Sequence, residues 1–125
     1  MENNKIFYTK SHEWIKFTDD DIALIGITDY AQNALGDIVF ITLPSEGDII
    51  TAGESFGDIE SVKAVSEIFS PVSASVTKVN EDVFDNPEII NSDAFGTWLL
   101  EVSDITDKSE FLNAEEYEAF CASEE

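Results

Sequence analysis

The chain has 125 residues, of which 43% are hydrophobic, so we expect one globular domain spanning residues 1–125. Its formal net charge is −21, because 27 acidic groups outnumber 6 basic ones, and every basic group is a lysine. This charge argues against binding to nucleic acids or anionic membranes, which both require cationic groups. It favours protein partners that carry positive patches, although the same acidity also serves solubility.

Cysteine content and apolar runs point to a cytoplasmic protein. Cys121 is the single cysteine, so no disulfide forms within the chain. The longest apolar run, residues 22–27, is far too short to span a bilayer. Residues 1–5 have neither the apolar core of a signal peptide nor the Arg-rich character of an organelle presequence.

Strand signals dominate the first two thirds of the chain. Apolar alternation and short buried runs predict strands at 13–17, 21–27, 37–43, 48–51, 55–61, 65–69, 74–79 and 98–102. A helical period over 28–35 has Asp29 as its expected N-cap and Gly36 after its last turn. Asn113 opens a C-terminal helix with a second capping box. This pattern predicts a mainly β sandwich or flattened barrel with small flanking helices.

Lys63 is the one basic residue between Lys16 and Lys78. It falls between the predicted strands 55–61 and 65–69, which places it at the tip of a hairpin. An isolated amine among acidic and apolar neighbours suits covalent modification. The alternative is an ordinary surface lysine on a turn, paired weakly with an acidic neighbour. Because nearby acids favour the charged amine, acylation would need an enzyme and an activated donor.

The sequence carries few of the patterns expected of an enzyme. Residues 53–57 match the G-x-S-x-G elbow of serine hydrolases, but a strand rather than the required helix is predicted after Gly57. The only histidine, His12, precedes the serine, whereas that fold places it afterwards. No zinc, calcium or phosphate-loop motif occurs. We therefore expect no metal and no catalytic residue, with chemistry supplied by a cofactor or by partner enzymes.

Four separated motifs resemble the H protein family of the glycine cleavage system. They are YTKSHEW at 8–14, GITDYAQ at 26–32, LGDIVF at 35–40, and ESVKA at 60–64 followed by SPVS at 70–73. The resemblance runs from about residue 7 to residue 121. It implies a lipoyl hammerhead-type β fold with lipoic acid amide-linked to Lys63, and with Glu60 in the hairpin that a lipoylating enzyme recognises.

The resemblance also implies a carrier role without catalysis. A glycine decarboxylase (P protein) would pass the aminomethyl group of glycine to the lipoyl group, and an aminomethyltransferase (T protein) would remove it. Dihydrolipoamide dehydrogenase (L protein) would then reoxidise the dithiol. A lipoate ligase or a lipoyl or octanoyl transferase would attach the cofactor to a monomeric carrier. The matching positions for a cleft that holds the loaded arm are Ser11, Glu13 and Glu67, the last in place of the family's commoner aspartate.

Three other functions remain open at this point. A lipoyl-relay protein, which donates lipoyl groups to other lipoyl domains, would share the same motifs. A biotin carrier would place the lysine between two methionines, whereas Val62 and Ala64 flank Lys63 here. An independent enzyme would need the catalytic groups that the sequence lacks.

Overall fold

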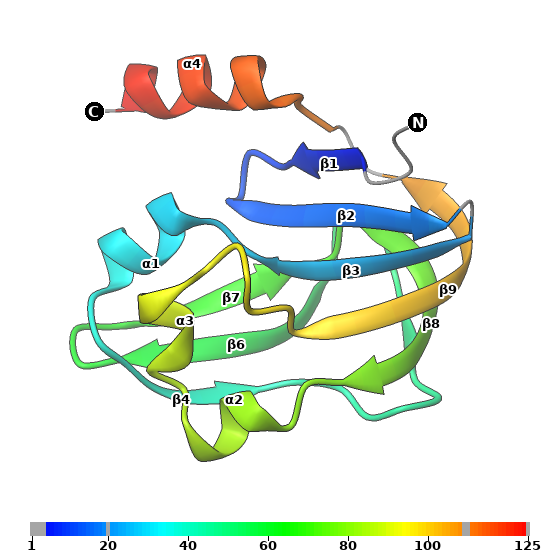
Figure 1. Cartoon of the computed structure of the whole chain (residues 1–125), viewed down its shortest axis with the longest axis horizontal. Helices are drawn as coiled ribbons and strands as arrows, with labels where there is room; N and C mark the ends of the chain where they lie inside the picture. Colours follow the sequence, from blue (N-terminus) through cyan, green and yellow to red (C-terminus); the bar gives the residue numbers. More distant parts are fainter. Residues whose placement is uncertain (1–4, 20, 109–110, 125) are drawn as a thin grey trace.

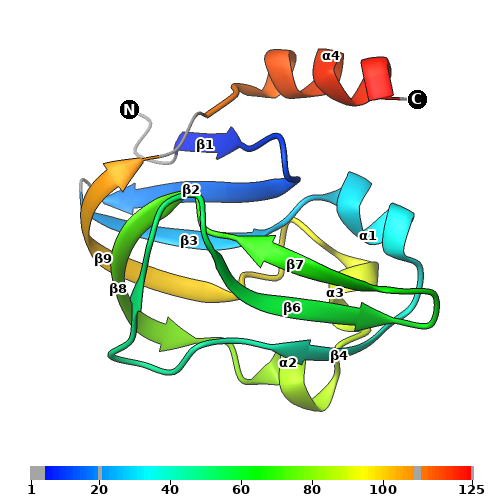
Figure 2. The ribbon, with the colours of Figure 1, turned by 180° about the vertical axis from the view of Figure 1, so that it is seen from behind.

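The computed structural model describes residues 5–19, 21–108 and 111–124, which form two antiparallel sheets with short helices around them. Figures 1 and 2 show the two sheets facing each other and the C-terminal helix lying beyond β1. The larger sheet has the strand order β1-β2-β3-β9-β8-β5. Its strands are β1 (Lys5–Tyr8), β2 (Glu13–Asp19), β3 (Ile22–Ile27), β9 (Leu100–Lys108), β8 (Val72–Val79) and β5 (Ile49–Ile50). The mainly β architecture expected from the sequence is confirmed.

The smaller sheet has the order β4-β6-β7, so β7 is one of its edge strands. Its strands are β4 (Ile38–Thr42), β6 (Ser55–Ser61) and β7 (Val65–Phe69). Strands β6 and β7 form an antiparallel hairpin in which Glu60 pairs with Val65 and Asp58 pairs with Glu67. Consecutive side chains of a strand point to opposite faces, so these four residues share the outer face.

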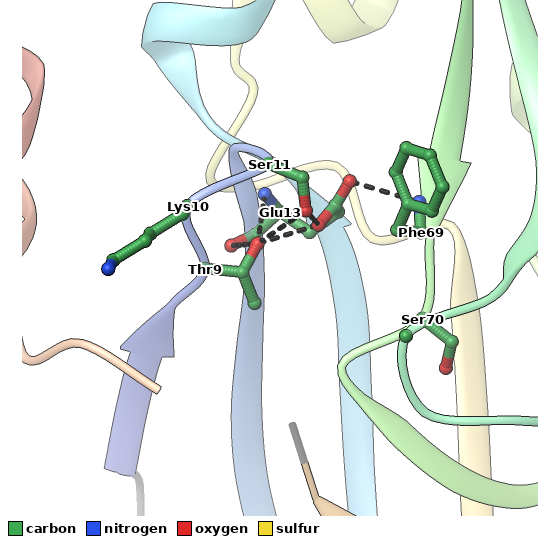
Figure 3. A pocket seen from close by; sticks show the side chains of 7 residues that line it. Thr9, Lys10, Ser11, Glu13, Phe69 and Ser70 are labelled. Carbon is green, nitrogen blue, oxygen red and sulfur yellow. Dashed lines mark hydrogen bonds between the residues drawn. The ribbon is translucent and has the colours of Figure 1, made fainter. Parts of the chain in front are cut away.

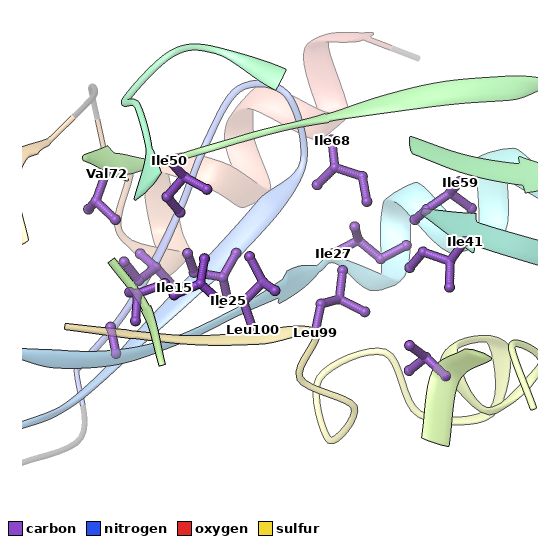
Figure 4. Packing of buried hydrophobic residues seen from close by; sticks show 14 of the residues in the cluster. Ile15, Ile25, Ile27, Ile41, Ile50, Ile59, Ile68, Val72, Leu99 and Leu100 are labelled. Carbon is purple, nitrogen blue, oxygen red and sulfur yellow. The ribbon is translucent and has the colours of Figure 1, made fainter. Parts of the chain in front are cut away.

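The core fills the space between the two sheets. Figure 4 shows core side chains from both sheets in one cluster, including Ile15, Ile25 and Leu100 of the larger sheet and Ile59 and Ile68 of the smaller one. All five side chains are almost fully buried. Each such side chain contributes about 1.5–3 kcal/mol relative to an exposed one, so this interface holds the hairpin against the rest of the fold.

Four helices complete the structure: α1 (Asp29–Leu35), α2 (Asp82–Asp85), α3 (Ile89–Ser92) and α4 (Ala114–Glu124). The predicted N-cap of α1 was wrong by one residue. Thr28 has extended dihedral angles and its hydroxyl accepts a hydrogen bond from the Ala31 amide, whereas Asp29 is already helical and accepts from the Gln32 side chain at 2.9 Å. Gly36 ends the helix with φ of 83°, as expected.

Other local predictions were confirmed only in part. The capping box of α4 is confirmed, because the Asn113 side chain accepts from the Glu116 amide at 2.8 Å and the Glu116 side chain accepts from the Asn113 amide at 2.9 Å. The strand expected at 98–102 lies at Leu100–Lys108, and β1, α2 and α3 were not predicted. In the described part of the chain, every helix is too short or too polar to cross a membrane.

Candidate functional site

Lys63 lies in the three-residue loop that joins β6 to β7, and its side chain is exposed. Ser61 organises this loop with three hydrogen bonds. Its hydroxyl oxygen accepts from the Lys63 and Ala64 amides, both at 3.1 Å, and donates to the Ala64 carbonyl at 3.2 Å. The Ser61 amide also donates to the Ala64 carbonyl at 2.8 Å. The loop therefore presents Lys63 in a defined backbone conformation.

The same loop is attached to the segment between α1 and β4. The Val62 amide donates to the Asp37 carbonyl at 3.0 Å, and Figures 1 and 2 show the two segments side by side at one end of the molecule. The Lys63 side chain passes over Gly36, where a Cβ would lie 3.3 Å from its Cε atom. Glycine at position 36 thus provides both the positive φ of the helix end and room for the lysine stem.

A pocket of about 370 Å³ lies where the turn before β2 meets the far end of β7. It is lined by Thr9, Lys10, Ser11, Glu13, Gly53, Phe69 and Ser70. Figure 3 shows the hydroxyls of Thr9 and Ser11 directed at the carboxylate of Glu13, with the side chain of Lys10 directed away from it. The polar groups of the pocket therefore converge on one carboxylate.

Glu13 is buried, with 2% of the residue exposed, and its carboxylate accepts three hydrogen bonds. Thr9 and Ser11 donate to Oε1 at 2.6 and 2.5 Å, and the amide of Phe69 donates to Oε2 at 3.0 Å. Burial raises the pKa of Glu13 above its usual 4.5, although these hydrogen bonds oppose the rise. A carboxylate offers about four lone-pair sites, so about one remains for a donor in the pocket.

The contact with Phe69 joins the two sheets. Strand β7 is an edge strand, so amides on its free side have no strand partner, and Glu13 supplies the acceptor for one of them. This contact gives Glu13 a structural role in addition to its place in the pocket.

The turn that carries Ser11 and Glu13 is held from several directions. The Thr9 amide donates to the Glu13 carbonyl and the His12 amide donates to the Thr9 carbonyl, both at 3.0 Å, with His12 at φ of 72°. The Tyr117 hydroxyl of α4 lies 2.7 Å from His12 Nδ1. This arrangement fixes the turn and connects the pocket to the C-terminal helix.

The structure brings together only some of the predicted site residues. Ser11 and Glu13 meet in the pocket, and Glu60 lies on the same hairpin as Lys63, three residues before it and paired with Val65. Glu67 is exposed on the outer face of β7 and does not line the pocket, although it lies two residues before Phe69 on the same face. Lys63 and Phe69 are six positions apart in the chain, which corresponds to at most about 20 Å at the rise of an extended strand.

Sequence reasoning missed three participants: Thr9, the Phe69 amide and Ser61. Thr9 and Ser11 precede Glu13 by four and two residues, a spacing that is visible in the sequence. The Phe69 amide is 56 residues from Glu13 and gives no local signal. Within residues 5–19, 21–108 and 111–124, no group of three or more His, Cys, Asp or Glu side chains is placed to bind a metal.

Comparison with known proteins places these features in a family. The family model described as "Glycine cleavage H-protein" matches residues 6–124. The "Glycine cleavage system H protein" of Lachnoclostridium phytofermentans is 51% identical over 124 residues, which are 99% of this chain and 96% of the relative. The "Probable glycine cleavage system H protein" of Natronomonas pharaonis is 54% identical, over 92% of each chain. A crystal structure of a glycine cleavage system H protein from Mycobacterium marinum superposes with a TM-score of 0.90 at 38% identity, covering 98% of this chain and 99% of that one.

Proposed function

The chain belongs to the glycine cleavage H-protein family, the lipoyl carriers of the glycine cleavage system, and on that premise we propose that Lys63 is its lipoyl attachment site. The protein is a non-catalytic carrier subunit that serves the enzymes of that system. When bound, a lipoyl group supplies a disulfide that accepts the aminomethyl group derived from glycine. The residues of this chain present Lys63 to the enzymes and protect the aminomethyl group that the lipoyl arm carries.

The observation that carries the proposal is the position of Lys63 at the tip of the β6–β7 hairpin. The lysine is exposed, its loop is fixed by Ser61, and its stem lies over a glycine. An acylating enzyme can therefore reach the amine without unfolding any part of the hairpin. Glu60 on the adjoining strand is exposed on the same hairpin, which supports its proposed part in recognition by that enzyme.

We propose that the pocket around Glu13 binds the amine of the aminomethyl group carried on the lipoyl arm. A protonated amine would find the remaining lone pair of the Glu13 carboxylate and the hydroxyl oxygen of Ser11, which can accept while its proton is donated to Glu13. Glu67 lies on the face of β7 between Lys63 and Phe69. An arm laid along this face passes Glu67 before it reaches the pocket, so Glu67 is proposed to attract the cation during entry.

Mass spectrometry of protein purified from its own cells tests the attachment site. Wild-type protein should carry one lipoyl group, and the Lys63→Arg variant should carry none because arginine keeps the charge but offers no acylatable amine. Lys78→Arg, at another exposed lysine, is the matched control and should stay lipoylated. Lipoyl on a peptide without Lys63, or an unmodified wild type, would refute the assignment.

The lifetime of isolated, loaded protein tests the pocket. A charge-assisted hydrogen bond contributes about 1.5–3 kcal/mol, so Glu13→Gln should release the carried group about tenfold faster or more, while lipoylation of Lys63 is unchanged. A smaller acceleration is expected for Glu67→Gln. Glu118→Gln, at an exposed position on α4, is the control. Equal lifetimes in all of these proteins would remove Glu13 and Glu67 from the proposed site.

Partner identities follow from membership of the system and stay predictions for this chain. They are the decarboxylase, the aminomethyltransferase, dihydrolipoamide dehydrogenase and a lipoylating enzyme. The cytoplasmic location, the monomeric state and the single domain over residues 1–125 also stay predictions. Deleting the gene and measuring glycine cleavage separates the carrier role from the lipoyl-relay alternative, which predicts loss of lipoyl from other proteins instead.

A further inference from the structure

The turn between β1 and β2 is held by two helices on the side away from the pocket. Ser11 and Glu13 line the pocket, whereas His12, which lies between them in the chain, does not. The His12 ring is instead stacked on Tyr30 of α1, with 4.5 Å between the ring centroids, and its centroid lies 5.8 Å from that of Phe120 of α4. Figures 1 and 2 show the turn between α4 and α1. The two helices therefore hold the residue that connects Ser11 to Glu13.

The hydroxyl of Tyr117 joins α4 to this turn and to α1. It lies 2.7 Å from His12 Nδ1 and 2.7 Å from the hydroxyl of Thr28, which is the N-cap of α1. The Thr28 amide also donates to the His12 carbonyl at 3.0 Å. Thr28 and Tyr117 are buried, so water cannot readily replace these bonds. Burial raises the pKa of Tyr117 above its usual 10, so the hydroxyl keeps its proton and can both donate and accept.

His12 has a backbone conformation that side chains other than glycine's rarely adopt. Its φ of 72° lies in the left-handed region, and such a conformation persists only where surrounding contacts hold it. Ser11 and Glu13 are bonded to His12 on either side, so the directions of their side chains depend on this conformation. The hydrogen bond of 2.5 Å from the Ser11 hydroxyl to the Glu13 carboxylate spans His12. Loosening His12 therefore changes the geometry of the pocket.

We propose that Tyr117 is a positioning residue for the carried amine, because it fixes His12 and so the two pocket residues beside it. This inference rests on the proposed binding of the amine in the pocket around Glu13. Tyr117 does not line that pocket, so it acts through the turn and not by contact with the amine. Without its hydroxyl, the turn would spend part of its time in conformations in which Ser11 and Glu13 no longer face the amine together.

Release of the aminomethyl group from isolated, loaded protein tests the proposal. Hydrolysis of the carbon–sulfur bond consumes one water and yields formaldehyde, ammonium and the lipoyl thiol, so formaldehyde measures release. Tyr117→Phe removes the hydroxyl but keeps the ring that stacks on Tyr8. Release should be about threefold faster, less than for Glu13→Gln, because the pocket residues remain present.

A double-mutant cycle tests whether Tyr117 acts through His12. His12→Asn keeps a residue that tolerates the left-handed conformation but removes the imidazole, and it should speed release at least as much as Tyr117→Phe. The double variant should be no faster than His12→Asn, because the hydroxyl of Tyr117 then has no imidazole to hold.

Asn80→Ala is the matched control for a loss of stability alone. Asn80 donates to the Trp98 carbonyl at 2.7 Å and accepts from the Asp82 amide at 3.2 Å. It follows β8, whose other end is next to the pocket residue Ser70. The variant should be less stable in urea but should release the group at the wild-type rate.

The amide proton of Phe69, which is hydrogen-bonded to Glu13, gives a second readout by NMR. Its resonance should move upfield in Tyr117→Phe and stay in place in Asn80→Ala. Wild-type release or an unmoved resonance in Tyr117→Phe, with fast release from Glu13→Gln, would overturn this inference alone. So would additive effects in the double variant, or equally fast release from Asn80→Ala. Wild-type release from Glu13→Gln would refute the proposed amine pocket, and this inference with it.

Discussion

Replacing Ser61 by alanine should loosen the loop that presents Lys63 without touching the lysine itself. The substitution removes three hydrogen bonds, from the Lys63 and Ala64 amides and to the Ala64 carbonyl. The net contribution of each is about 0.5–1.5 kcal/mol when the partners would otherwise be buried. Lys63 and Ala64 are exposed, so water can replace part of this bonding. We therefore expect the free energy of unfolding to fall by about 1–2 kcal/mol, at the low end of the sum.

The same loss should appear in acylation kinetics. If the loop conformation that fits the ligase becomes less populated by the same free energy, kcat/KM should fall between about fivefold and thirtyfold. Ser66→Ala is the control, since Ser66 is an exposed serine of β7 whose side chain makes no hydrogen bond within the described part of the chain. Urea unfolding and intact-mass kinetics on Ser61→Ala, Ser66→Ala and wild type supply the comparison. Values for Ser61→Ala that match Ser66→Ala in both assays would refute a role of Ser61 in fixing the loop.

Three further outcomes follow from the geometry. Tyr117→Phe removes the hydroxyl that lies 2.7 Å from both His12 Nδ1 and Thr28 Oγ1, so thermal or urea unfolding should show a loss of about 1–2 kcal/mol with lipoylation unchanged. Because burial raises the pKa of Glu13, the folded state binds more protons than the unfolded state between the two pKa values. Wild type should therefore gain stability relative to Glu13→Gln as pH falls through the raised pKa toward the usual 4.5, and a stability difference that does not vary with pH would contradict this. With a net charge of −21, the on-rate of aminomethyl loading should fall as salt rises, and stopped-flow rates that are indifferent to salt would exclude electrostatic steering.

Local features of the sequence predicted much of the fold. The β6–β7 hairpin and the capping box at Asn113 depend on residues close together in the chain, and both are found where they were expected. The N-cap of α1 was missed because Thr28 and Asp29 are adjacent and both suit that position. Backbone geometry decides between them: Thr28 is extended, and the helix has already begun at Asp29.

The pocket was only half predictable, for a physical reason. Ser11 and Glu13 are two residues apart on one turn, so their meeting could be expected from the sequence. The approach of Glu13 to the Phe69 amide depends on how the two sheets pack, which no local pattern encodes. Glu67 could be matched to the family, but its orientation on the outer face of β7 depends on strand register.

The burial of Glu13 bears on the function of the pocket. Its structural task is to accept a hydrogen bond from the free edge of β7, and the amide oxygen of a glutamine could accept the same bond. The Thr9 and Ser11 hydroxyls could accept from the amide nitrogen of that glutamine, since hydroxyls both donate and accept. Burying an ionised carboxylate costs more free energy than burying an amide, and the same desolvation raises the pKa of Glu13. The fold therefore needs an acceptor at this position but not a charge. A cation in the pocket would stabilise the ionised carboxylate of Glu13, which burial disfavours. This is the property expected of a site that binds a protonated amine.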